Sequence, residues 1–110
     1  MGEPADIPPG TLYMLILKTL SSFGSMHGYG IAQHIQQTSD EVLQVEEGSL
    51  YPALQRMLIK GWVLAEWRQS ENNRRARYYK LTPEGRKQLA RELREFERVM
   101  AAITRVIQTA

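Results

Sequence analysis

Residues 48–54 read Gly-Ser-Leu-Tyr-Pro-Ala-Leu, and residues 74–77 read Arg-Arg-Ala-Arg. The first stretch lies at the start of a short helix that we expect over residues 49–60. The second lies in the long polar turn of a hairpin, between strands expected at residues 63–67 and 78–81. A compact helix followed by a ribbon with a cationic turn is typical of a winged helix-turn-helix, in which the helix enters the major groove of DNA and the ribbon reaches the flanking backbone. This order of elements favours a regulator over an enzyme.

Charge is distributed unevenly along the chain, although the net charge of the 110 residues is only +2. Residues 1–55 hold one basic residue against six acidic ones, whereas residues 56–110 hold thirteen basic residues against six acidic ones. Nine of the basic residues fall within residues 56–87, beside three acidic ones. A local concentration of cations is what attracts phosphate. On charge alone, a solvated charged face is an equally good interpretation.

Composition excludes several classes of site. The longest apolar run, residues 14–17, is too short to span a bilayer and no basic-then-apolar leader precedes it, so we expect a single cytoplasmic domain. The chain has no cysteine, which excludes disulfides, thiolate zinc sites and cysteine nucleophiles. His27 and His34 have no acidic residue at ligand spacing, so neither a metal nor a cofactor is expected. Without a glycine-rich phosphate loop or paired carboxylates, no enzymatic activity is expected.

Apolar periodicity predicts two helices before the one at residues 49–60. The first is expected over residues 12–20 and the second over residues 29–37. Residues 27–30, with two glycines, are interpreted as a turn between them, and residues 42–45 as a short strand. In the third helix, Ser49 is the expected N-cap and Pro52 is placed in the first turn, because a proline in the interior would break the helix. Gly61 is expected to end it. The predicted buried face consists of Leu50, Leu54, Met57 and Leu58.

Eight residues are expected to contact DNA. The third helix is expected to present Ser49, Tyr51, Gln55 and Arg56 to base edges or adjacent phosphates. The wing is expected to hold the backbone or minor groove through Asn73, Arg74, Arg75 and Arg77. On the wing strands, Tyr79 and Leu81 are expected to face the helices. Two alternatives are a winged helix used as a protein-interaction module, which needs no cationic tip, and an RNA-binding module, which makes the same phosphate contacts.

The last helix is expected to begin at Pro83, with Thr82 as its N-cap. Its apolar residues step by four and three, which is the spacing of a helix-pair seam: Leu89, Leu93, Phe96, Met100, Ile103 and Ile107. The seam predicts a two-fold homodimer through residues 86–108, to which Leu12 and Leu15 of the first helix contribute. Packing within one chain is the alternative.

These signals predict a fold class that is mainly α with a small β-hairpin (α+β). Residues 1–9 are expected as a flexible N-terminal tail, with Pro9 at or just before the first helical turn. Residues 10–82 are expected as a winged helix-turn-helix DNA-binding domain. Residues 83–110 are expected as a C-terminal dimerisation helix.

Four motifs along the chain form a specific combination: Gly10-Thr11-Leu12, His27-Gly28-Tyr29-Gly30-Ile31, Glu46-Glu47-Gly48-Ser49-Leu50-Tyr51-Pro52-Ala53-Leu54 and Arg77-Tyr78-Tyr79-Lys80-Leu81-Thr82-Pro83-Glu84-Gly85. This combination resembles the PadR family of bacterial transcriptional regulators. They occur in the family's order, and the likeness extends over residues 10–107. The single C-terminal helix resembles the short subfamily, which dimerises through that helix and the first one. The resemblance implies a repressor that small molecules release, often phenolic acids, drugs or other stress compounds.

The seam also predicts a cavity for a small aromatic effector at the dimer centre. In a multidrug-sensing branch of the family, a tryptophan from the last helix of each subunit sandwiches flat ligands there. At the corresponding stretch this chain has Phe96, an aromatic platform without the hydrogen-bonding edge of an indole. Methionine and phenylalanine pack less uniformly than leucine and isoleucine, which favours a cavity. Its expected lining is Tyr13, Leu93, Phe96 and Met100, with Leu12 or Leu15. A fully packed coiled-coil core without room for a ligand is the alternative.

Overall fold

The computed structural model of the protein describes residues 3, 5–8 and 10–109. Within these residues the chain forms four helices and five strands. The helices are α1 (Leu12–Phe23), α2 (Gly28–Thr38), α3 (Glu47–Ile59) and α4 (Pro83–Gln108). The strands are β1 (Ala5–Asp6), β2 (Ser25–His27), β3 (Leu43–Gln44), β4 (Val63–Gln69) and β5 (Arg75–Leu81). The predicted fold class, mainly α with a small β-hairpin, is confirmed.

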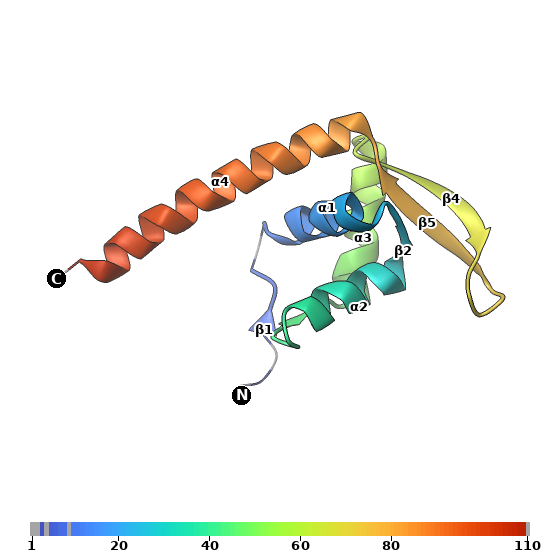
Figure 1. Ribbon diagram of the computed structural model, residues 1–110, viewed down its shortest axis with the longest axis horizontal. Helices are drawn as coiled ribbons and strands as arrows, with labels where there is room; N and C mark the ends of the chain where they lie inside the picture. The colour runs from blue at the N-terminus through green and yellow to red at the C-terminus, as the bar shows by residue number, and fades with distance from the viewer. Residues whose placement is uncertain (1–2, 4, 9, 110) are drawn as a thin grey trace.

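Helix α1 lies at the centre of the domain. It packs against α2, α3, α4 and β5, and Figure 1 shows the β4–β5 hairpin to one side of this bundle and α4 running over it. Ile16, Leu17 and Leu20 of α1 are fully buried, because the sequence widens the apolar stripe of this helix to face several neighbours at once. The rest of the buried core consists of Met14, Ile31, Ile35, Leu50, Ala53, Leu54, Met57, Val63, Tyr79, Leu81 and Leu89.

The hairpin strands are longer and the turn between them is shorter than predicted. Strands β4 and β5 each span seven residues, so Arg75 and Arg77 lie in a strand and only Arg74 lies in the turn. The turn is closed by the Ser70 N–H, which donates to the Arg74 carbonyl at 2.6 Å, and Asn73 adopts a positive φ of 61°. Polar residues can continue a ribbon because backbone groups alone form the ladder. The prediction missed this because it relied on β-rich composition.

Two short strands were not predicted by any local pattern. Strand β2 adds to β5 to give a three-stranded antiparallel sheet in the order β2-β5-β4. Strand β1 pairs in parallel with β3, the short strand expected near residues 42–45. Part of residues 1–9 is therefore hydrogen-bonded to the domain, while the flexibility of that tail stays a prediction. Pro9 lies outside the described residues.

Helix α2 begins earlier than expected, so residues 27–30 are not a turn between elements. His27 ends β2 and acts as the N-cap of α2, where its Nδ1 atom accepts a hydrogen bond from the Gly30 N–H at 3.0 Å. An N-cap side chain that accepts from the first turn satisfies a backbone donor that would otherwise lack a partner. Gly28 and Gly30 consequently belong to the first helical turn.

The predicted start of α3 was wrong. Glu46 is the N-cap, and Ser49 lies inside the first turn, where its N–H donates to the Glu46 carbonyl at 3.0 Å. Pro52 is the sixth residue of the helix and not part of the first turn. It removes the hydrogen bond that the Gly48 carbonyl would accept. Because Gly48 and Pro52 are both exposed, water can satisfy that carbonyl and the helix continues.

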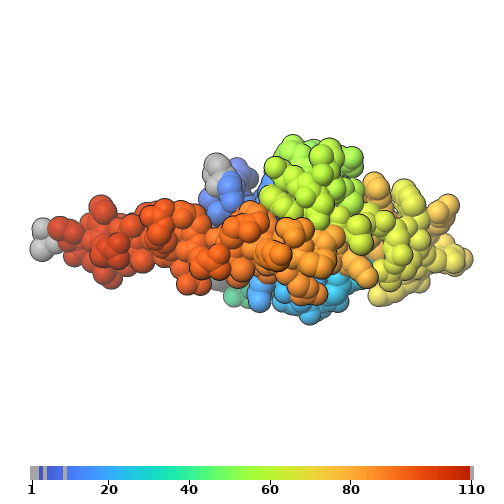
Figure 2. All heavy atoms as spheres, turned by 90° about the horizontal axis from the view of Figure 1, so that it is seen from above, coloured from blue at the N-terminus to red at the C-terminus, as the bar shows by residue number. Residues whose placement is uncertain are grey.

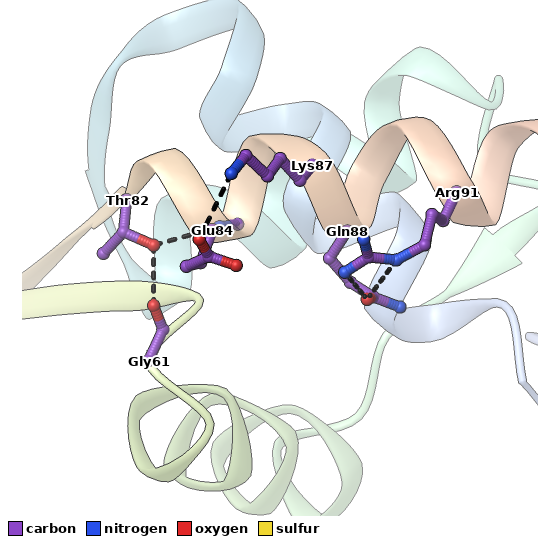
Figure 3. Close-up of polar contacts among 7 residues, drawn as sticks. Gly61, Thr82, Glu84, Lys87, Gln88 and Arg91 are labelled. Carbon is purple, nitrogen blue, oxygen red and sulfur yellow. Dashed lines mark hydrogen bonds and ion pairs between the residues drawn. The ribbon is translucent and has the colours of Figure 1, made fainter.

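The end of α3 and the start of α4 meet at one corner. Gly61 ends α3 as predicted, with a φ of +75°. Its N–H donates to the Leu58 carbonyl and the Trp62 N–H donates to the Met57 carbonyl, which is a Schellman motif. Thr82, the predicted N-cap of α4, accepts from the Gly85 N–H at 3.0 Å and donates to the Gly61 carbonyl at 2.6 Å (Figure 3). One threonine hydroxyl thus caps α4 and fastens it to the end of α3.

Helix α4 extends well beyond the domain. Its 26 residues span about 39 Å, and Figures 1 and 2 show the C-terminal half projecting past the other helices. Leu89 is only 7% exposed and belongs to the core of its own chain, and Leu93 packs against that core. Farther along, the apolar side chains are exposed: Phe96, Val99, Met100, Ile103, Val106 and Ile107. Among the described residues, no helix has the length and apolar character needed to cross a membrane.

Candidate nucleic-acid interface

The exposed side of α3 is divided into a central stripe and two flanks. Its core-facing residues are Leu50, Ala53, Leu54 and Met57. With about 100° between successive residues, the opposite stripe is formed by Gly48, Pro52, Gln55 and Ile59. Tyr51 and Arg56 then lie on opposite sides of that stripe. Gln55, predicted as a base-reading residue, is exposed at the centre of it.

Tyr51 lies on the flank that faces α2. Its ring rests on Gly28, where a β-carbon would come within 2.8 Å of Tyr51 Cε1, so only glycine permits this approach. Burial raises the pKa of the Tyr51 phenol, and the neighbouring Glu47 carboxylate raises it further. Tyr51 therefore remains neutral and braces α3 against the start of α2, while 44% of its surface stays exposed.

Arg56 and Ser49 lie on the flank that faces α1 and α4. The Nε–H group of Arg56 donates to the Tyr13 hydroxyl group of α1. Both Arg56 and Ser49 line an open cleft of about 540 Å³ that also borders Glu92 of α4. The four helix residues predicted to contact DNA are therefore exposed, but they do not share one face.

The β4–β5 hairpin is the wing of this fold, and two of its arginines lie on the same face of β5 as the residues that pack on the core. Tyr79 and Leu81 are buried on this face of β5, and Arg77 and Arg75 follow at the same alternation toward the tip. Trp67 of β4 pairs with Arg77, and the Arg75 guanidinium carbon lies 5.4 Å from the centre of the Trp67 ring. Trp67 is exposed. Its ring and the guanidinium groups of Arg75 and Arg77 therefore form one aromatic and cationic surface on the wing.

Asn73 and Arg74 differ in what they can do at the tip. The Asn73 side-chain oxygen accepts a hydrogen bond from Gln69 Nε2, so this residue holds the turn together. Arg74 is exposed beside it. Within the described part of the chain, the ion pairs are Arg68–Glu66, Lys87–Glu84 and Arg98–Glu95, and none of them involves Arg74, Arg75 or Arg77. The charges of the three wing arginines are therefore not neutralised by ion pairs with other described residues, and they can attract a negatively charged partner.

An open groove of about 930 Å³ lies between the wing tip and α2. Two of its exposed residues, Tyr29 and Gln33, come from the first two turns of α2 and had no place in the predicted site. The signal that could have indicated them is the His27 cap, because the residues that follow a cap lie on the first turns of the first helix-turn-helix helix, which crosses the DNA backbone in such folds. The other groove residues are Phe23, Met26, His27, Gly28, Gly30, His34, Gln37, Tyr51, Ser70, Glu71, Asn72, Arg74, Arg75 and Ala76.

Comparison with known proteins connects this geometry to one family. The sequence model of the transcriptional regulator PadR-like family matches residues 16–91. A transcriptional regulator from Clostridium thermocellum is similar in structure with a TM-score of 0.82 and 29% identity, covering 90% of this chain and 95% of that one. A PadR family transcription regulator from Clostridium difficile gives a TM-score of 0.76 and 28% identity, covering 89% of this chain and 99% of that one. A PadR family transcriptional regulator from Eggerthella lenta gives 0.76 and 25%, covering 92% and 85%.

Proposed function

This chain belongs to the PadR-like family of transcriptional regulators and has its DNA-binding winged-helix fold, and from that premise we propose that it is a cytoplasmic, homodimeric repressor of an inverted-repeat operator. The observation that supports DNA as the partner is the charge of the wing arginines, which form no ion pair with any described residue, together with the exposed stripe of α3. The exposed seam of α4 supports the homodimer. In this proposal α3 is the recognition helix.

The proposed binding mode divides the work between helix and wing. Gln55, with Tyr51 and Arg56 on either side, enters the major groove, and Ser49 lies near the phosphates at the start of the helix. Arg74, Arg75 and Arg77 hold the flanking backbone or minor groove. A two-fold axis then requires half-sites about one helical turn apart (~34 Å) or a multiple of it. Glu46 and Glu47 at the start of α3 repel phosphate, so we assign most of the electrostatic affinity to the wing.

Removing the wing cations tests this mode. Replacing Arg74 and Arg75 together by alanine is expected to weaken binding to every DNA sequence and to lower the salt slope by up to about two units, because two phosphate contacts are lost. Replacing Gln55 by alanine is expected mainly to change the preference among sequences. Fluorescence anisotropy between about 50 and 200 mM salt measures both effects.

A matched control for the wing variant is the replacement of Arg94 and Arg105 of α4 by alanine, which removes the same charge far from the wing. It should bind DNA with nearly unchanged salt dependence. If the wing variant kept the DNA affinity and the salt slope of the wild type, the proposed contact between the wing and DNA would be contradicted. Equal or tighter binding of the wild-type protein to an RNA duplex of the same sequence would instead favour the RNA-binding alternative.

We further propose a small aromatic effector that binds between the two α4 helices. Phe96 and Met100 are 40% and 42% exposed in one chain, and they would line this site together with Leu93. Tyr13 faces Arg56 and Trp62, so its place in the lining is the weakest part of the predicted set. A flat ligand between two Phe96 rings would gain about 0.5–1.5 kcal/mol per aromatic pair beyond its burial.

Titration with planar aromatic compounds tests the effector site. Binding is expected to change the fluorescence of Trp62 and Trp67 and to release DNA, and Phe96→Ala is expected to abolish both responses. Failure of every compound to bind the wild-type protein, or intact binding by Phe96→Ala, would rule out an effector site at this place. A fully packed seam would then be the better description.

A further inference from the structure

A chain of aromatic and cationic contacts joins the recognition helix to α1. The Arg56 Nε–H group donates to the Tyr13 hydroxyl group. The Tyr13 ring meets the Trp62 ring edge to face, with 6.1 Å between ring centres and 78° between planes. On the other side, Lys60 Nζ lies 5.3 Å from the centre of the Trp62 ring. Tyr13 is thus held at both ends, by a hydrogen bond and by an aromatic contact.

Trp62 gives this chain of contacts a fixed base. Its N–H is used by the Schellman ending of α3, and its carbonyl accepts from the Thr82 N–H at 3.1 Å. That carbonyl also lies so close to Gly85 that a β-carbon there would overlap it. The backbone of Trp62 is therefore anchored to α3 and α4 at once. The Tyr13 ring packs on a residue that cannot shift easily.

The hydrogen bond from Arg56 to the Tyr13 hydroxyl group determines how the guanidinium group of Arg56 is oriented. A guanidinium group is a rigid planar fork with five N–H donors, one on Nε and four on the terminal nitrogens. When Tyr13 takes the Nε donor, the plane of the fork is set and the terminal nitrogens remain available. Arg56 is exposed on the flank of the α3 stripe, so its two terminal nitrogens can donate a pair of hydrogen bonds to a DNA phosphate.

We propose that Tyr13 is a positioning residue for DNA recognition, whose hydroxyl group holds the Arg56 guanidinium in the orientation that meets a DNA phosphate beside α3. This inference rests on the proposed function. The open cleft beside Arg56 gives its side chain room to turn away from DNA, and Glu92 on the wall of that cleft would attract it. The Tyr13 hydroxyl group opposes this movement, together with the Tyr13 ring, whose centre lies 5.7 Å from the Arg56 guanidinium carbon.

Tyr13 also lies next to residues of the proposed dimer contact, so a change at that contact can alter the orientation of Arg56. Tyr13 follows Leu12 and precedes Leu15 by two positions on α1, and both leucines are half-buried in one chain and belong to the proposed dimer contact. A small displacement of α1 at that contact moves the hydroxyl group away from Arg56, because a hydrogen bond tolerates only a few tenths of an ångström. Tyr13 would then release Arg56 without any change in α3 itself.

The test is Tyr13→Phe, which removes the hydroxyl group and keeps the ring on Trp62. With a duplex that the wild-type protein selects from a random library, the variant is expected to lose roughly two- to tenfold in affinity, because a free Arg56 must be immobilised again on binding. Its salt slope should stay unchanged, whereas Arg56→Ala should lower the slope by about one unit. In the Arg56→Ala background, Tyr13→Phe should have no further effect.

Two results would overturn this role. One is wild-type affinity in Tyr13→Phe at every salt concentration, and the other is an equal loss with and without Arg56. An NMR arm without DNA is independent of the proposed function: the Arg56 Nε–H signal, assigned with Arg56→Lys, should be protected from exchange in the wild type and lose protection in Tyr13→Phe. The Arg74 and Arg75 variant reports on DNA binding itself, so failure of that function would be recognised separately.

Discussion

Glutamates at Met100 and Ile103 are expected to convert the protein into monomers that no longer bind the operator. Both side chains are less than half exposed along the α4 seam, at 42% and 45%, and a dimer would bury them completely. An isolated charge in an apolar interface costs several kcal/mol, and two-fold symmetry doubles the number of charges buried. We expect the dimer dissociation constant to rise by at least about a hundredfold. Sedimentation velocity over a concentration series measures it.

The choice of positions keeps this experiment free of a folding defect. Leu93 is the more obvious seam residue, but it packs on the core of its own chain and a charge there would also unfold the monomer. A matched control places glutamates at Ala101 and Gln108, which lie on the opposite side of α4. That control should remain dimeric and bind DNA. A wild-type protein that is monomeric at micromolar concentration would contradict the proposed dimer.

Gly85→Ala is expected to destabilise the fold strongly. A β-carbon at this position would overlap the Trp62 carbonyl oxygen and lie 3.0 Å from Leu81 Cδ2. The carbonyl belongs to the backbone and already accepts from the Thr82 N–H, so α4 would have to shift at its first turn. Forced overpacking typically costs about 1–3 kcal/mol, and loss of the Thr82 cap would add about 1 kcal/mol. Urea unfolding at one fixed protein concentration measures the change.

Gly48→Ala is the matched control for that prediction. A β-carbon at Gly48 meets nothing within 4 Å, and Gly48 lies in the first turns of α3. Alanine is favoured over glycine in a helix by up to about 1 kcal/mol, so this variant should be slightly more stable than the wild type. A Gly85→Ala protein with wild-type stability would contradict the prediction, because α4 would then be able to move away from the Trp62 carbonyl at little cost.

Local chemistry explains which parts of the fold could be predicted from sequence. Gly61 and Thr82 were placed correctly because a helix end or cap depends on residues only a few positions away. The start of α3 was misplaced because serine favours the N-cap and proline favours the first turn. Ser49 and Pro52 both lie farther into the helix than these preferences predict, and solvent exposure makes that tolerable. Strands β1 and β2 depend on partners distant in the sequence, and nothing in their own residues marks them.

The same reasoning applies to the candidate site. The wing arginines and Gln55 could be proposed from charge and helical spacing. The contacts that hold Tyr51 on Gly28 and Arg56 on Tyr13 could not, because Gly28 and Tyr13 are far from α3 in the sequence. The hydrogen bond by which Asn73 closes the turn could not be predicted either, and the DNA contact expected of Asn73 stays a prediction.

In the proposed dimer, the exposed half of α4 would make activity depend on the amount of protein in the cell. A dimer forms in proportion to the square of the monomer concentration, so in the proposed repressor a twofold fall in chain number would lower the dimer population up to fourfold when monomers predominate. Free monomers would also expose an apolar helix face, which quality-control proteases attack more readily than a packed one. Scarce chains would thus be both inactive and short-lived, and the regulated gene would respond to the dose of its regulator with a threshold and not in simple proportion.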